Sequence, residues 1–382
     1  MAYGTINADV IGTSVAGSNI GAGNASAMKN RLINGAMVID QRNAGASVTL
    51  SGGTYTMDRW KADTSQASKF TVQQNAGSVT PPAGFNNYLG VTSTSAYSVL
   101  TSDYFSITQS IEGYNVADLD WGTVNAKTVT LSFWVRSSLT GTFSGSLINA
   151  DNTRSYPFSY SISSANTWEQ KSITIIGDTT GTWLKNNSYG IKVWFSLGTG
   201  ATYKGTAGSW LPSLYLGAIG ETSVVGTSGA TFYITGVQLE VGSSATGFEY
   251  RQYGQELALC QRYCFNVAQD TSVLSMYNGL SRGSGTYFYS IPTPVAMRTT
   301  PSFAVSNSGT VRITYNGTEA NSSANSSTVG GSAMTINFGT SIANRNLILV
   351  SYETVSGVSS AAGRADLGLT FNYGTFIFSA EL

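Results

Sequence analysis

The sequence predicts an all-β protein, and three observations lead to this fold class. Short segments with an apolar residue at every second position recur along the chain, glycine-rich turns separate them, and only one segment has helical periodicity. The composition agrees, since the 382 residues include 43 glycines and only 10% are charged, against about 25% in ordinary soluble domains. We therefore expect an extended N-terminal arm, an antiparallel β-sandwich of the jelly-roll type, a short helical neck and a second, smaller β-sandwich domain.

The charge balance and the absence of histidine exclude several classes of function. The 20 basic residues equal the 20 acidic ones, so the chain offers no basic surface to nucleic acid. Without histidine there is no histidine-based catalytic triad, no histidine-ligated zinc site and no imidazole general base. No apolar run approaches the roughly 20 residues that span a bilayer, and the N-terminus lacks a signal-peptide pattern. We expect no membrane insertion.

Residues 1–30 are expected to form an arm without a core of its own. They are small and polar, and no helix or strand period persists among them. The arm is still more apolar than a plain linker requires, which favours docking on a partner. The apolar residues that would dock are Ile6, Val10, Ile11, Val15 and Ile20.

Residues 31–252 are predicted to form the antiparallel jelly roll. Strict alternation places four apolar residues on one face in each of two segments: Val129, Leu131, Phe133 and Val135, then Ile191, Val193, Phe195 and Leu197. The segment 231–241 alternates as well, but its phase changes at Gly236, which indicates a β-bulge. A succession of short strands without helices between them is typical of a sandwich.

The one helical segment, QELALCQRYCFNV, lies within a neck predicted at 253–268. Leu257, Cys260, Cys264 and Val267 follow the a/d spacing of a seam between helices of different chains. The alternative is a helix packed on the sheet of its own domain. Ideal helical geometry suits a disulfide poorly, so we expect Cys260 and Cys264 to be thiols. From 269 to 382 the pattern is again that of a β domain.

Two tryptophans and three acidic residues are candidate ligand contacts. Trp134 and Trp194 fall on the outward faces of their strands, where an indole ring can stack on a sugar; packing under a loop or against another protomer is the alternative. Glu112, Asp118 and Asp120 could hold a structural Ca²⁺, or could simply be solvated acids of a surface loop. Carboxylate pairs for glycan hydrolysis can be drawn from the 20 acids but none stands out, so we predict no catalytic residue and no other cofactor.

A series of longer motifs resembles a known family. The motifs, in chain order, are NRLINGAMVIDQRNAGASVT, YTMDRW, IEGYNVADLDWGT, VTLSFWVRSSLTGTF, RSYPFSY, ANTWEQKSITIIGDTTGTW and FYITGVQLEVGSSATGFEYRQYGQELALCQRY. Over about residues 1–265 they resemble bacteriophage tail fibre and minor virion proteins with a carbohydrate-binding-module-like jelly roll. The resemblance implies a homotrimer whose arm attaches to tail, baseplate or capsid proteins and whose C-terminal domain forms a distal tip. Cys264 departs from the family pattern, which has an aromatic residue after CQRY.

The function expected from these observations is that of a non-enzymatic phage tail fibre. It would be made in the cytoplasm of a bacterial host and would act on the surface of the virion. The distal domain would contact a host surface glycan or protein through Tyr287, Phe288, Tyr289 and the loop 316–331. The alternative is a capsid decoration fibre or a structural tail adaptor without a host-binding role.

Overall fold

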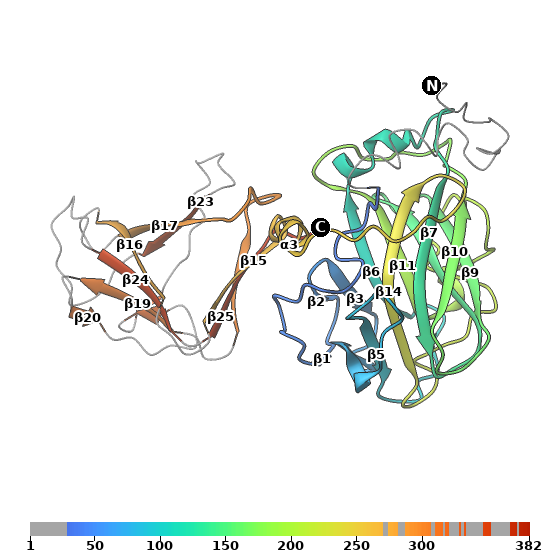
Figure 1. The fold of residues 1–382 in the computed structure, drawn as a ribbon, viewed down its shortest axis with the longest axis horizontal. Helices are drawn as coiled ribbons and strands as arrows, with labels where there is room; N and C mark the ends of the chain where they lie inside the picture. The colour runs from blue at the N-terminus through green and yellow to red at the C-terminus, as the bar shows by residue number, and fades with distance from the viewer. Residues whose placement is uncertain are drawn as a thin grey trace, which may run out of the picture. The chain divides into compact units, whose positions relative to one another are not determined.

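The structure is a computed structural model. It describes residues 29–269, 274–281, 287–306, 310–315, 318–320, 328–329, 332–333, 347–352, 367–372 and 374–382, and within 267–292 and 303–376 it describes backbone elements alone. The chain divides into two compact units, of which the first ends at Tyr253 and also holds Leu382, and the second is Gly254–Glu381. Both units are drawn in Figure 1.

The first unit is a sandwich of two six-stranded sheets in which neighbouring strands pair antiparallel (Figure 1). The first sheet has the order β1 (Val48–Thr49), β4 (Phe70–Gln74), β5 (Leu89–Ser93), β14 (Thr231–Val241), β7 (Val129–Ser137) and β10 (Glu169–Ile175). The second sheet has the order β2 (Thr54–Met57), β3 (Trp60–Thr64), β6 (Tyr104–Glu112), β11 (Tyr189–Thr199), β8 (Gly141–Asn149) and β9 (Ser155–Ile162).

Short elements join these strands. A parallel pair consists of β12 (Lys204–Gly205) and β13 (Gly217–Ala218). Single 3-10 turns lie at η2 (Ala76–Ser78), η3 (Gly113–Asn115), η4 (Ala117–Leu119) and η5 (Ala201–Tyr203). Among the residues described, no helix is both long and apolar enough to cross a membrane.

The alternation read from the sequence is confirmed in the core of this sandwich. The four inward residues of β7 and the four of β11 are all buried, and Phe133 of the first sheet contacts Phe195 of the second with ring centroids 5.1 Å apart. The bulge in β14 is also confirmed, because its pairing with β7 shifts register between Thr235 and Gln238. Gly236 there has a φ of +62°, a conformation that favours glycine. The bulge keeps Val237 and Leu239 on the core side.

The helix α3 (Tyr253–Gln261) starts at the last residue of the first unit, and the second unit continues from it in strands. A three-stranded sheet has the order β15 (Cys264–Gln269), β25 (Gly374–Ser379) and β18 (Ser302–Ser306). A six-stranded sheet has the order β20 (Thr318–Ala320), β19 (Thr310–Tyr315), β24 (Leu367–Asn372), β16 (Leu274–Ser281), β17 (Tyr287–Pro292) and β23 (Leu347–Tyr352). A two-stranded antiparallel pair consists of β21 (Thr328–Val329) and β22 (Ser332–Ala333). The predicted all-β class is confirmed.

The helical neck, by contrast, is shorter than predicted, and the a/d seam is wrong. Leu257 and Cys260 lie on α3, but Cys264 and Val267 lie on β15, where Cys264 is opposite Ser379 of β25. A nine-residue helix is marginal by itself, whereas β15 gains a full ladder of pairs with β25. Cys260 and Cys264 are both buried and form no disulfide.

Candidate functional site

Trp194, one of the two tryptophans proposed as a sugar contact, is not a surface residue. It lies on the outward side of β11, but it is 4% exposed and packs with Ile148 and Leu216. Tyr104 of β6, Tyr203 and Leu214 pack on the same cluster. Tyr203, Leu214 and Leu216 come from the chain that runs from η5 to β13. The prediction is therefore wrong for Trp194, and the loop-packing alternative describes it.

Trp134 is half-buried on the outer face of the first sheet, between Thr235 of β14 and Gln170 of β10. A Cβ atom at Gly236 would lie 3.1 Å from Trp134 Cδ1 and 2.6 Å from Phe85 Cζ, so the side chains of Trp134 and Phe85 both pack against this glycine. Gln170, on the open side of Trp134, is exposed. The structure therefore leaves the Trp134 ring partly accessible.

Two further groups of aromatic side chains accompany Trp134. One reaches it through Phe85 at Gly236, and the other contains Tyr233, which pairs with Arg136 two positions along β7. Together with Trp134 we call them the aromatic face. On one side, Phe85, Phe248 and Tyr250 pack with centroid distances of 5.0–5.6 Å, and Tyr250 is 60% exposed. On the other side, Tyr88 contacts both Tyr233 and Trp168 at 5.1 and 5.6 Å. The aromatic face consists of Phe85, Tyr88, Trp134, Trp168, Tyr233, Phe248 and Tyr250.

Polar groups border the aromatic face and fix its rings. The guanidinium of Arg136 lies 5.4 Å from the centroid of the Tyr233 ring, and its Nε donates to the carbonyl of Asn166. The indole N–H of Trp168 donates to Thr80 O over 2.9 Å. Burial raises the pKa of the Tyr88 hydroxyl, which donates to Ala76 O and stays protonated at neutral pH. Tyr88, Tyr233 and Phe85 are thus buried parts of the face, whereas Trp134 and Trp168 are half-buried and Tyr250 is exposed.

The three acidic residues proposed for calcium do not form a cluster. Glu112 is buried at the end of β6, Asp118 pairs with Arg31 at 2.7 Å, and Asp120 lies 3.5 Å from Lys185. Across the residues described by the structure, no three cysteine or carboxylate side chains converge as a metal would require. The three carboxylates therefore do not converge on one point.

Three tryptophans that the sequence left unassigned come together at one end of the sandwich. Trp121, Trp183 and Trp210 pack edge to face, with centroid distances of 4.7, 5.2 and 5.2 Å. Each ring N–H donates to a main-chain carbonyl, respectively those of Lys127, Thr180 and Ile176. These contacts tie three loops together. The spacing of the three tryptophans in the sequence does not predict this cluster, because each comes from a different loop.

The residues predicted for the distal tip can be placed only in part. Tyr287, Phe288 and Tyr289 lie on β17, opposite Tyr352, Ser351 and Val350 of β23, while their side chains are outside the described residues. The loop 316–331 lies mostly outside the described residues, apart from β20 and β21. The five apolar residues of the arm, Ile6, Val10, Ile11, Val15 and Ile20, are also outside them.

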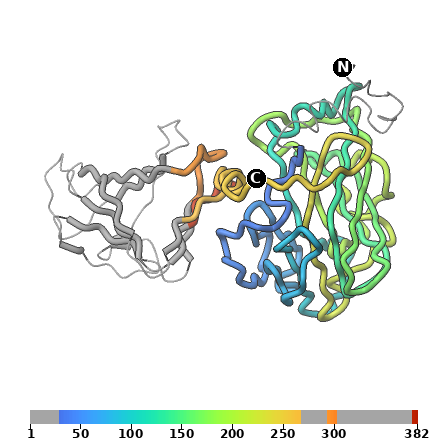
Figure 2. The backbone as a smooth tube through the Cα atoms, viewed as in Figure 1, coloured from blue at the N-terminus to red at the C-terminus, as the bar shows by residue number. Residues whose placement is uncertain are grey.

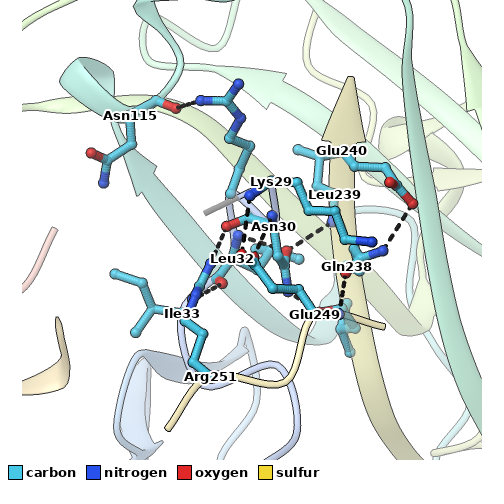
Figure 3. Close-up of polar contacts among 12 residues, drawn as sticks. Lys29, Asn30, Leu32, Ile33, Asn115, Gln238, Leu239, Glu240, Glu249 and Arg251 are labelled. Carbon is cyan, nitrogen blue, oxygen red and sulfur yellow. Dashed lines mark hydrogen bonds and ion pairs between the residues drawn. The ribbon is translucent and has the colours of Figure 1, made fainter. Parts of the chain in front are cut away.

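An extensively bonded polar site lies at the start of the described chain, beside the segment that follows β14. Residues 29–35, the incoming segment, run beside residues 246–251, the outgoing segment, through which the chain leaves β14 (Figures 2 and 3). We call the hydrogen bonds between these two segments, and from the incoming segment to the sandwich, the clamp. In Figure 2 the two segments are dark blue and yellow.

Glu249 and Arg251 of the outgoing segment hold the incoming backbone directly. The Glu249 carboxylate accepts from the N–H groups of Lys29 and Asn30 over 3.3 and 2.8 Å. The Arg251 guanidinium donates to the carbonyls of Asn30 and of Leu32, the latter over 3.1 Å. Lys29 Nζ returns two bonds, to Thr246 Oγ1 at 2.5 Å and to Gly247 O at 2.6 Å.

The incoming segment is also bonded to both sheets. The Asn30 amide donates to Val237 O and accepts from the N–H groups of Leu32 and Leu239, each over 3.0 Å. The Gln109 amide of β6 exchanges two 2.8 Å bonds with the main chain of Ile33. Lys29 and Asn30, which the sequence prediction placed in the arm, are thus already held by the sandwich.

A second polar layer supports the clamp from behind. Gln238 Oε1 accepts from the Glu249 N–H, and Gln238 Nε2 donates to Glu240, both over 2.8 Å (Figure 3). Glu240 in turn accepts from the N–H and hydroxyl of Thr246 over 2.8 and 2.6 Å. Gln238 and Glu240 are buried on β14, so these bonds form where water competes weakly.

Comparison with known proteins gives only distant likenesses. No protein-family model and no curated protein matches the chain. The enzymatically active domain of tailspike protein 4 from bacteriophage CBA120 is similar at 12% identity and a TM-score of 0.28, over 56% of this chain and 21% of that one. This chain thus spans about a fifth of the tailspike domain.

Carbohydrate-binding modules are similar to this chain at equally low sequence identity and TM-score. A family 11 module from Clostridium thermocellum, solved with a beta-1,3-1,4-mixed-linked tetrasaccharide, shares 10% identity over 53% of this chain and 98% of the module, with a TM-score of 0.27. A CBM4 structure shares 14% identity over 55% of this chain and 98% of that one, with a TM-score of 0.27. At such values these likenesses carry no functional information about this chain.

Proposed function

We propose that this chain is a non-enzymatic structural protein of a bacteriophage virion, a homotrimeric tail fibre. In this proposal the N-terminal arm attaches the chain to tail, baseplate or capsid proteins, and the C-terminal domain meets the host surface. The observation that carries the proposal is the clamp, because an arm that holds a domain to a particle must itself be bonded strongly to that domain. The sequence motifs over residues 1–265, which resemble those of virion proteins and occur in the same order, support the same proposal.

Attachment is tested by assembling particles with the full chain and with a variant that lacks residues 1–28, the part of the arm before the first clamped residue. We expect the shortened chain to unfold at the same denaturant concentration as the full chain but to be absent from purified particles by mass spectrometry. A fold control is Lys185→Met, which alters only an exposed ion pair. Normal incorporation of the shortened chain would overturn the attachment role.

The alternative position, on the capsid or as a tail adaptor, is distinguished by location and by adsorption. Gold-labelled antibody against the chain should mark tail tips in electron micrographs, and soluble full chain should reduce adsorption of particles to the host. The triple variant Tyr287→Ala, Phe288→Ala, Tyr289→Ala should compete less well. Capsid labelling without competition would favour the decoration or adaptor role.

Glycan contact by the aromatic face is a second candidate function, favoured by the half-buried ring of Trp134 beside exposed Gln170. A sugar placed on this ring would find a fixed stacking surface and an amide partner. Titration of host envelope polysaccharide should change tryptophan fluorescence in the wild type and in Trp194→Phe, and should leave Trp134→Ala unchanged. No reducing ends should appear, since the proposed role is binding.

A further inference from the structure

The incoming and outgoing segments run parallel to each other within the clamp. Lys29 contacts residues 246, 247 and 249, Asn30 contacts 249 and 251, and Leu32 contacts 251. The residue numbers on both segments rise together along the contact (Figure 3). Lys29 and Arg251, the bonded residues nearest the two ends of the full chain, therefore lie at opposite ends of the bonded stretch.

This geometry decides how the clamp responds to tension between the two ends of the chain. Two parallel segments that are pulled by their far ends slide along each other, so the bonds between them bear the load together. Segments pulled from the same end would instead open one bond at a time. Loading in shear requires several bonds to break in a single event, which raises the force needed.

The bonds themselves are of the stronger kind. Those made by Glu249, Arg251 and Lys29 join a charged group to a backbone or hydroxyl group, which makes them stronger than neutral bonds. Only 4% of the Arg251 side chain and 14% of the Glu249 side chain are exposed. Water therefore has little access to replace a bond of Arg251 or Glu249 that lengthens under load, whereas the bond from Lys29 Nζ to Gly247 O is exposed.

The pairing with β14 adds a further set of bonds on the incoming side. The N–H of Arg31 donates to Leu239 O, and the N–H of Val237 donates to Gly35 O, both over 2.9 Å. A Cβ atom at Gly35 would lie 2.2 Å from Val237 O, so only glycine permits this close approach. The incoming segment is thus held on one side by the outgoing segment and on the other by the sheet.

We propose that the clamp is a load-bearing junction. Tension between the ends of the chain is borne by the bonds between residues 29–32 and 246–251, and the sandwich strands remain paired until the clamp breaks. The role requires only that the chain is pulled from its two ends, so it does not depend on what the arm or the tip binds. Its failure and that of the proposed virion function are therefore distinguishable.

The test is single-molecule force spectroscopy on the full chain with handles at its two ends. Unfolding of the first unit is recognised by the chain length that residues 29–253 release. At constant force, Arg251→Met should shorten the lifetime of the folded first unit about tenfold or more, the effect of lowering a barrier by one strong bond. Arg154→Met is the matched control, because it breaks a buried ion pair outside the clamp.

A second pulling direction separates load-bearing from ordinary stabilisation. With handles at Ser164 and Ser228, which lie in exposed loops, the clamp is not in the load path, and Arg251→Met and Arg154→Met should shorten the lifetime by similar factors. With handles at the ends, Arg251→Met should have the much larger effect. Equal effects in both directions would overturn the proposal. Lys29→Met, which removes the bonds to Thr246 and Gly247, replaces Arg251→Met where that variant does not fold, and the same outcomes decide.

Discussion

The carboxylate of Glu249 accepts a hydrogen bond of 2.8 Å from the main-chain N–H of Asn30, although 219 positions separate the two residues. This bond closes the sandwich at the point where the chain both joins and leaves it. All seven tryptophans of the chain lie in the first unit, at positions 60–210. Tryptophan fluorescence therefore follows the unfolding of this unit in the predictions below.

Asn30→Ala should destabilise the first unit by about 2–4 kcal/mol, because it leaves the buried Leu239 N–H and Val237 O without their side-chain partner. Urea unfolding followed by fluorescence measures the loss. Asn86→Ala, at an exposed position, should change stability by less than about 0.5 kcal/mol. Similar losses in the two variants would show that the Asn30 contacts contribute little.

Gly236→Ala should cost more than Gly229→Ala, although both glycines have a positive φ, +62° and +73°. The left-handed conformation costs any other residue about 1–2 kcal/mol, and this is the whole expected effect at Gly229, where a Cβ meets nothing within 4 Å. At Gly236 the Cβ would lie 2.6 Å from Phe85 Cζ, which should add about 1–3 kcal/mol. Thermal or urea unfolding of both variants gives the difference, and equal losses would contradict the contact.

Arg154→Met should destabilise the first unit by about 3–5 kcal/mol, because it leaves the Asp178 carboxylate buried without its cation. Arg154 binds Asp178 through two bonds, Nε at 2.6 Å and an Nη at 2.8 Å, and the Asp178 side chain is 3% exposed. Lys185→Met removes the partner of exposed Asp120 and should cost under about 1 kcal/mol. Denaturant titration measures the loss of stability in both variants. A similar loss in the two would contradict the prediction.

Trp194→Ala should cost about 3–5 kcal/mol, as expected for a large aromatic side chain removed from a packed site. Trp134→Ala should cost less than half of that, since its ring is only half-buried and leaves no closed cavity. Urea unfolding compares them. Acrylamide quenching of two single-tryptophan variants should show that the Trp134 indole is the more accessible one, and the reverse order would contradict the assignment of the two faces.

Glu221→Gln should gain stability relative to the wild type as the pH rises from 4 to 9. Burial raises the pKa of Glu221. Hydrogen bonds from Ser144 and Thr199 and the charge of Lys204 lower this pKa, but by less than burial raises it. The folded protein therefore holds this proton more tightly than the unfolded chain, and the wild type loses stability as the pH rises through the raised pKa. Glutamine has no such titration. Urea unfolding across this range gives the difference between the two proteins, and a difference independent of pH would contradict the shift.

Local patterns were sufficient for the strands of the sandwich. Alternation with period two assigns inward and outward positions without reference to the partner strand, so the core residues of β7 and β11 could be predicted correctly. The bulge at Gly236 was also predictable, because a change of phase beside a glycine is visible within one segment. The all-β class followed from the same patterns.

Sequence patterns failed where a distant segment decides the outcome. Trp194 occupies an outward position, but Tyr203, Leu214 and Leu216 cover it. No pattern within β11 predicts that these residues pack there. The helical spacing of Cys264 and Val267 is real in the sequence, yet pairing with β25, more than 100 residues later, makes a strand there. Long-range pairing outweighs a local propensity of this size.

The sequence by itself determined the fold class, the inward faces of the strands and the position of the bulge, because each depends on neighbours within a few residues. Only the tertiary structure decided which tryptophan stays accessible and where the helix ends. It alone revealed the clamp, since Asn30, Gln238, Glu249 and Arg251 are ordinary polar residues in sequence. They act together because folding brings the two ends of the sandwich side by side, where burial makes each hydrogen bond costly to lose.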